Sequence, residues 1–187
     1  MDFVPQQPYH VFNRGNNRET VFFEPANYLY FLRKLRQHVA PHSELLSYCL
    51  MPNHFHLLLC PLETTKTVHP LHRAVGTVLS SYTQGVNRDR QRTGSLFQAK
   101  TKAQPLGTDE AYLRTCFHYI HQNPVRAGLV GRLEDWPYSS YRDYAGLRNG
   151  TLCRQTTARS LVDLPSSHDL FRREAENMIP PAYVTGW

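Results

Sequence analysis

Cysteine is scarce in this 187-residue sequence, and long hydrophobic runs are missing from it. The four cysteines stand far apart without a C-x-x-C pair, so neither a disulfide framework nor a zinc ribbon is predicted. No window approaches the length of a membrane span, and the first residues lack the basic and then apolar pattern of a secretion signal. We therefore expect reduced thiols, a cytoplasmic protein and no membrane partner.

Lysine is also rare, because only four of the 21 basic residues are lysines and arginine supplies the rest of a formal charge of +6. The planar guanidinium group matches phosphate oxygens two at a time, which makes a polyanionic partner worth testing. A positive excess of this size also serves solubility alone, so charge leaves both explanations open. The length and a hydrophobic content of 41% indicate a globular protein with one sizeable core.

The periodicity of apolar residues predicts strands alternating with helices. The expected order, β-α-β-β-α-β-α, indicates an α+β domain in which helices pack on an antiparallel sheet. After residue 146 the sequence is polar, with a modest helical signal around Asp169 to Met178. The expected elements are a strand at Tyr9 to Arg14, a helix from Pro25 to before Pro41, a hairpin of Leu45 to Met51 and His54 to Cys60, a helix over residues 71–86, a strand from Ser95 to Gln104, and a helix capped by Thr108, Asp109 and Glu110 that ends at Asn123.

The triplet His54-Phe55-His56 is the sharpest local feature. Side chains alternate along a strand, so the two imidazoles project on one face while Phe55 points to the other. Two imidazoles so placed can chelate a metal ion or hold a phosphate. An isolated pair of strand histidines more often serves the fold, so the surrounding sequence has to decide.

Tyr119 and Asn123 are four residues apart in the last predicted helix, which places them on one face if the helix persists that far. A helical tyrosine usually fills the core. Asn123 also suits the N-cap of a short helix that Pro124 opens and Gly128 closes. Both explanations stay open at this point.

Four separated blocks in order carry a resemblance to a known family. They are Tyr9 to Arg18, Met51 to Leu58, Gly94 to Gln98 and Tyr119 to Leu129. Over roughly residues 8–144 the chain resembles the Y1 transposases of the insertion-sequence 200 type, and within that group most of all the REP-associated tyrosine transposases. The blocks together are far more specific than an H-x-H motif alone.

The resemblance implies a ferredoxin-like, palm-type HUH nuclease fold, with a catalytic domain at 1–145 and a carboxy-terminal extension at 146–187 that is regulatory or partly disordered. It implies a single-stranded DNA endonuclease and strand transferase that acts on repetitive hairpins through a 5′-phosphotyrosine intermediate, as a monomer or homodimer. His54 and His56 match the HUH histidines, Tyr119 matches the nucleophile, and Asn123 sits where the family takes a third metal ligand. Gln122 is a weaker candidate for that ligand.

The chemistry also suits these residue types independently. Two histidines and an amide form an open site suited to Mg²⁺ or Mn²⁺, although histidine ligands suit zinc too. A divalent cation makes a phenol useful as a nucleophile by stabilising the charge that develops in the reaction. The general base stays open among His118, His121 and water.

DNA contacts are expected from basic residues in several segments, although clustered arginines also line solvated loops. Phe97 and Tyr138 are candidates for stacking on unpaired bases. The competing hypotheses are a non-catalytic hairpin-binding protein that keeps the transposase fold and, more distantly, a metal-dependent phosphohydrolase that uses bound water. The expected DNA-binding residues are Arg14, Arg18, Arg88, Arg90, Arg92, Lys100, Lys102 and Arg126.

Overall fold

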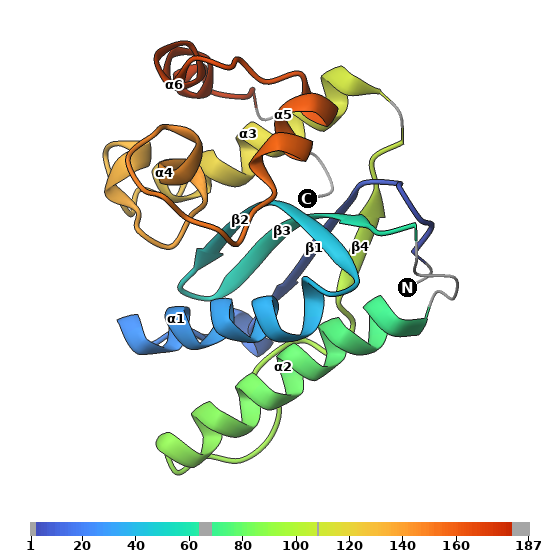
Figure 1. Cartoon of the computed structure of the whole chain (residues 1–187). Helices are drawn as coiled ribbons and strands as arrows, with labels where there is room; N and C mark the ends of the chain where they lie inside the picture. Colours follow the sequence, from blue (N-terminus) through green and yellow to red (C-terminus); the bar gives the residue numbers. More distant parts are fainter. Residues whose placement is uncertain (1–2, 64–68, 108, 181–187) are drawn as a thin grey trace.

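The computed structural model describes residues 3–63, 69–107 and 109–180. Its four strands form one antiparallel sheet in the order β2-β3-β1-β4, and the order of strands and helices confirms the predicted α+β class (Figure 1). The strands are β1 (Tyr9–Arg14), β2 (Ser43–Met51), β3 (His54–Pro61) and β4 (Lys102–Pro105), and the helices are α1 (Pro25–Lys34, extended by a π-helical turn at Leu35–Val39), α2 (His69–Asp89), α3 (Glu110–Arg126), α4 (Tyr141–Tyr144), α5 (Gln155–Val162) and α6 (His168–Glu176), with short 3₁₀ turns at Asn16–Arg18 and Leu133–Asp135.

Helices cover both faces of the sheet, and a different set of helices packs on each face. Helices α1 and α2 lie against one face, while α3 and the carboxy-terminal helices lie against the other (Figure 1). On the α1 side, the buried ring of Phe31 lies with its centroid 5.2 Å from those of Phe55 and Tyr82. This apolar packing confirms that Phe55 points away from its two neighbouring histidines.

The fourth strand is shorter than predicted, because its ladder with β1 covers only Lys102–Pro105. The cause is Asn13, whose buried side-chain amide donates to the carbonyl oxygen of Gln98 at 3.0 Å and to the hydroxyl of Thr101 at 2.9 Å. Backbone pairing resumes only at Gln98, whose amide donates to the carbonyl oxygen of Arg14 at 2.9 Å, so the Asn13 side chain takes the place of a backbone ladder over residues 99–101. The segment that carries Lys100 is a loop held beside β1.

Helix α3 contradicts the predicted boundary at Asn123, because it continues through Pro124 to Arg126. Proline removes one backbone donor, but the helix has its final stop only at Gly128, whose φ of +67° suits a glycine. The amide of Leu129 then donates to the carbonyl oxygen of Pro124 at 2.9 Å, which closes a Schellman-type end. Asn123 is therefore a residue of the helix and does not cap a new one.

The amino-terminal cap of α3 is as predicted for Asp109, whose carboxylate accepts from the backbone amides of Ala111 at 2.9 Å and Tyr112 at 3.2 Å. The other expected cap, Thr108, lies outside the described residues.

No helix in the described part of the chain is long and apolar enough to cross a bilayer.

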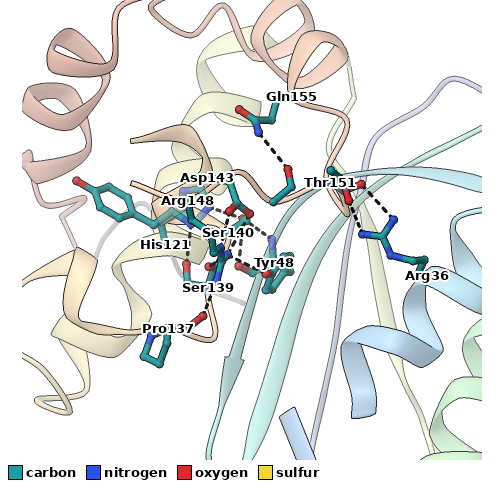
Figure 2. Close-up of polar contacts among 12 residues, drawn as sticks. Arg36, Tyr48, His121, Pro137, Ser139, Ser140, Asp143, Arg148, Thr151 and Gln155 are labelled. Atoms are coloured by element: carbon teal, nitrogen blue, oxygen red, sulfur yellow. Dashed lines mark hydrogen bonds and ion pairs between the residues drawn. The ribbon is translucent and has the colours of Figure 1, made fainter. Parts of the chain in front are cut away.

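The segment after α3 is fastened to β2 by polar contacts (Figure 2). The buried carboxylate of Asp143 pairs with Arg148, whose guanidinium group also donates to the hydroxyl of Tyr48 on β2 at 3.1 Å. Backbone bonds from Leu50 to Tyr138 and from Ser140 to Tyr48 occupy the outer edge of β2. An open strand edge is thereby covered.

The carboxy-terminal segment contains more structure than its sequence indicates. Helix α6 lies near the predicted signal, whereas α5 is a helix that the periodicity of the sequence did not predict. Residues 181–187 of the predicted extension lie outside the described residues, and the division of the chain at residue 145 stays a prediction.

Candidate active site

A cavity of about 530 Å³ lies on the α3 side of the sheet, where β1, β3 and α3 meet. All four sequence blocks that carry the resemblance contribute residues to its walls, and the block from Gly94 to Gln98 does so through Gln98. All four residues predicted to do chemistry line it, together with five of the predicted basic residues. The walls are formed by Phe12, Asn13, Arg14, Arg18, Met51, His54, Phe55, His56, Gln98, Lys100, Lys102, Tyr119, Asn123, Arg126 and Ala127.

His54 and His56 project into the cavity from β3, with ring centroids 5.0 Å apart. The Nδ1 atom of each ring is hydrogen-bonded to a neighbouring side chain. The Nδ1 atom of His54 lies 2.6 Å from Oδ1 of Asn53, and that of His56 lies 2.8 Å from Nε2 of His10. In both imidazoles, Nε2 is therefore the nitrogen that can interact with a ligand in the cavity.

Burial lowers the pKa of all three imidazoles. Desolvation, aided by Arg14, lowers the pKa of His54 to about 4, and desolvation lowers that of His10 to about 3. The pKa of His56 falls well below its usual value because of burial and the nearby His10, His54 and Arg14. At neutral pH these rings are uncharged, as ligands to a cation must be.

Tyr119 faces the histidines from α3, with its ring centroid 5.8 Å from that of His56. Burial raises the pKa of the phenol, while Arg126, a hydrogen bond with the side chain of Asn123, and Arg14 act to lower it. The guanidinium carbon of Arg126 lies 5.7 Å from the centre of the ring. The phenol is protonated at neutral pH and needs help from its surroundings to become a nucleophile.

The donor set fits a divalent cation bound together with substrate. Asn123 lies one turn beyond Tyr119, and its Nδ2 atom donates to the carbonyl oxygen of Tyr119 at 2.9 Å, which leaves Oδ1 as the acceptor atom. Two imidazole nitrogens and one amide oxygen are a suitable but incomplete shell, to which phosphate oxygens and water add. Among the described residues, no group of three or more His, Cys, Asp or Glu is arranged to hold a metal ion.

Three predicted DNA-binding residues lie away from the cavity. Arg88 lines a groove between α1 and α2, Arg90 stacks 4.1 Å from the ring centre of Phe23, and Arg92 donates to the side chain of Asn87. They are neighbours in sequence and do not line the cavity that the other five share. Their role in DNA binding stays a prediction.

The neighbours of Tyr119 on α3 face the other way. Nε2 of His118 lies 2.9 Å from Glu174 on α6. Nε2 of His121 lies 2.7 Å from the hydroxyl of Ser140, as Figure 2 shows. Gln122 donates to the carbonyl oxygens of Ala175 and Asn177. None of the three lines the cavity, so neither His118 nor His121 is placed beside Tyr119 as a general base.

The two aromatic residues expected to stack on bases are also engaged elsewhere. Phe97 is only 3% exposed and packs against Phe55, while Tyr138 stacks on Tyr28 with ring centroids 3.7 Å apart. Phe12 lines the cavity instead, with Lys102 5.5 Å from its ring centre. Alternation along β1 places Phe12 on the same face as His10, which is the signal that could have identified it.

Three further residues support the site and were not singled out from the sequence for a role there: His10, Asn13 and Asn53. Their side chains contact, in turn, His56, the loop with Gln98, and His54. All three fall inside the blocks that carry the resemblance. Buried polar residues beside an H-x-H motif are the available signal, but their partners depend on strand register.

Comparison with known proteins agrees with the resemblance. No family model matches the chain. A candidate REP-associated tyrosine transposase of Haemophilus influenzae is 30% identical over 104 residues, which cover 52% of this chain and 58% of that protein, so the chain spans little more than half of the relative's length. The solved structure of a REP-associated tyrosine transposase bound to a REP hairpin superposes with a TM-score of 0.60 at 19% identity, covering 78% of this chain and 84% of the other. The chain is thus similar in sequence to one REP-associated tyrosine transposase and has the fold of another.

Proposed function

We propose that this protein is a hairpin-specific, single-stranded DNA endonuclease and strand transferase of the REP-associated tyrosine transposase type. The observation that carries the proposal is the convergence of His54, His56, Tyr119 and Asn123 on one cavity, although they come from blocks far apart in the sequence. The similarity to a transposase and the fold of a hairpin-bound one support it.

In this proposal the phenolic oxygen of Tyr119 attacks the phosphorus of one DNA phosphodiester. A bond forms between that oxygen and phosphorus, the bond from phosphorus to the 3′-oxygen breaks, and the phenolic proton leaves through water while the 3′-oxygen becomes a hydroxyl. The product is a 5′-phosphotyrosine ester. Because the ester conserves the phosphodiester bond, attack by another 3′-hydroxyl joins strands without ATP.

The surrounding residues bind and orient the strand. Arg14, Lys100 and Lys102 line the cavity beside the histidines, where cationic side chains neutralise phosphates. Arg126 lies against the phenol ring and favours the charge that develops on its oxygen. A bound Mg²⁺ or Mn²⁺, held by His54, His56 and Asn123, would supply Lewis-acid stabilisation of the phosphate oxygens.

The test is a denaturing gel after incubation of the protein with single-stranded hairpin DNA taken from the flanks of its own gene. We expect a protein–DNA adduct with Mn²⁺ or Mg²⁺ that is absent with a chelator and absent in His54→Ala. A hairpin that binds equally well with chelator and is never cleaved would favour the non-catalytic DNA-binding protein. Cleavage without an adduct would favour a phosphohydrolase that uses water.

A further inference from the structure

The two cavity histidines have different partners behind them, and the first partner determines its histidine's tautomer. Oδ1 of Asn53 can only accept a hydrogen bond, and it lies 2.6 Å from Nδ1 of His54. The same amide donates through Nδ2 to the carbonyl oxygen of Arg18 at 3.0 Å, which fixes its orientation. Nδ1 of His54 must therefore carry the proton, and Nε2 offers a lone pair.

Arg18 is itself held in an unusual backbone conformation. Asn17 and Arg18 both have positive φ angles, of 53° and 61°. The turn is tight enough that a Cβ on Gly15 would lie 2.2 Å from the carbonyl oxygen of Glu19. Backbone strain of this kind persists only where the surroundings enforce it. The result is a carbonyl oxygen aimed at Asn53.

The partner of His56 is a third imidazole, which leaves two possible directions for the hydrogen bond. His10 is fully buried on β1, and its Nε2 lies 2.8 Å from Nδ1 of His56. If His10 donates, neutral His56 carries its proton on Nε2, which points at the cavity and blocks coordination. If His56 donates from Nδ1, its Nε2 is free to bind a cation, as in His54.

We propose that His10 and Asn53 are positioning residues that hold His56 and His54 in the same tautomer, with both Nδ1 atoms protonated and both Nε2 lone pairs facing the cavity. The proposal rests on the proposed function for its purpose, because such a pair of lone pairs is useful for holding a divalent cation. Partners that hydrogen-bond to the far nitrogen of a histidine ligand orient the ring and raise its basicity. The tautomers themselves exist before any metal or DNA binds.

The first test therefore needs neither metal nor activity. Long-range ¹H–¹⁵N correlation of histidine side chains in the metal-free full-length protein distinguishes the two tautomers, and His54→Gln and His56→Gln assign the signals. We expect both rings as the Nδ1–H form. In Asn53→Ala only His54 should become a mixture, whereas the matched control Asn16→Ala, which removes an exposed hydrogen bond to Ser95, should change neither ring.

The second test separates positioning from packing. Mn²⁺ binding, followed by the electron paramagnetic resonance of the free ion, should weaken by about 10- to 100-fold in His10→Leu. It should stay within a few-fold of wild type in His10→Gln, whose side-chain oxygen can accept from His56. A residue that only fills space at a fully buried position would give the opposite order, because leucine packs there better than an amide. Circular dichroism and urea unfolding show which variants are folded.

The outcomes distinguish this proposal from the proposed function. An Nε2–H tautomer for His56 in the wild-type protein, or equal Mn²⁺ binding by His10→Leu and His10→Gln, would overturn the role of His10. Unchanged His54 signals in Asn53→Ala would overturn that of Asn53. The expected tautomers with no DNA adduct on any hairpin would leave the positioning network standing and remove the transposase chemistry.

Discussion

The two faces of the sheet are made by the same strands and have opposite characters. On the α1 side, β3 contributes Phe55 to a cluster of aromatic rings, and on the α3 side it contributes His54 and His56 to a polar cavity. The apolar face gains stability from burial, whereas the polar face buries imidazoles and a phenol at a cost. One face therefore supports the fold, and the other carries the groups that suit catalysis.

Loss of a single oxygen on the polar face should have the largest effect. Tyr119→Phe removes the proposed nucleophile and almost no packing volume, so we expect DNA cleavage to fall below detection. The urea midpoint and hairpin binding should stay close to wild type. Cleavage assays with a labelled hairpin, run beside equilibrium unfolding, check both halves of this prediction. Residual cleavage at the wild-type site would assign the chemistry to another group.

A matched substitution on the apolar face should do the opposite, lowering stability while leaving the chemistry close to wild type. Phe31→Ala removes a fully buried ring that packs on Phe55 and Tyr82, and should lower the free energy of unfolding by about 3–5 kcal/mol. Urea unfolding measures the loss. Phe31→Leu, which keeps most of the volume, is the milder variant if the alanine form does not fold. In the folded fraction the rate of adduct formation should be close to wild type, and a selective loss of rate would show that the faces are not independent.

The buried imidazoles should make stability sensitive to acid. The pKa of His10 falls from 6.5 to about 3 through burial, and that of His121 falls well below its usual value through burial and the nearby His118. The unfolded chain takes up protons near pH 6.5 while the folded chain does not. The stability that these neutral rings carry is thus complete above pH 6.5 and is lost as the pH falls toward 3.

Each such ring should contribute a slope of about 1.4 kcal/mol per pH unit in the free energy of unfolding below pH 6.5. Urea unfolding between about pH 7 and about pH 5 measures that slope. His121→Gln should flatten it, because the pKa of this buried ring falls well below its usual value in the folded protein. A wild-type slope in His121→Gln would contradict the assignment.

The smallest effect is expected from replacing basic residues, which changes the affinity for the hairpin and its dependence on salt. Lys100 and Lys102 line the cavity, whereas Arg90 and Arg92 lie beyond the end of α2. Replacing the two lysines by alanine should weaken hairpin binding and reduce the slope of log affinity against log salt by about one unit for each phosphate that is no longer neutralised. The double variant of Arg90 and Arg92 is the comparison. A reduction equal to that of the lysines would extend the DNA footprint to the α2 side, and an unchanged slope would confine it to the cavity.

The sequence was sufficient for the order of strands and helices up to α3 and for the four cavity residues expected to do chemistry, but not for α4 and α5. The bounds of β1 and the inner ends of the hairpin strands were as predicted, because the Pro52-Asn53 turn and the apolar runs depend only on neighbouring residues, whereas β2 begins at Ser43 and β3 ends at Pro61, beyond the predicted outer ends. The length of β4 did not, because the side chain of Asn13 replaces backbone pairing from 85 residues away. The stop predicted at Pro124 failed because a single missing donor does not break a helix that packing supports.

In the candidate site, too, some features follow from neighbouring residues and others depend on residues far away in the sequence. His54, His56, Tyr119 and Asn123 share a cavity as the sequence blocks predicted, because alternation and helical spacing set their directions. Helical spacing also turns His118 and His121 away from the face that carries Tyr119 and Asn123, whereas their partners on α6 and in the segment that follows α3 could not be predicted from neighbouring residues. Arg88, Arg90 and Arg92 show that closeness in sequence does not place charges at a site.

Peptide mapping of the DNA adduct by mass spectrometry is the most direct measurement of the central claim. The hairpin is incubated with wild-type protein and Mn²⁺, the nucleic acid is digested, and each of the 11 tyrosines is inspected for a residual nucleotide. We expect the modification on Tyr119 alone, joined through its phenolic oxygen to a 5′-phosphate. A modification on any other residue, or none while the DNA is cleaved, would contradict the assignment of Tyr119 as the nucleophile.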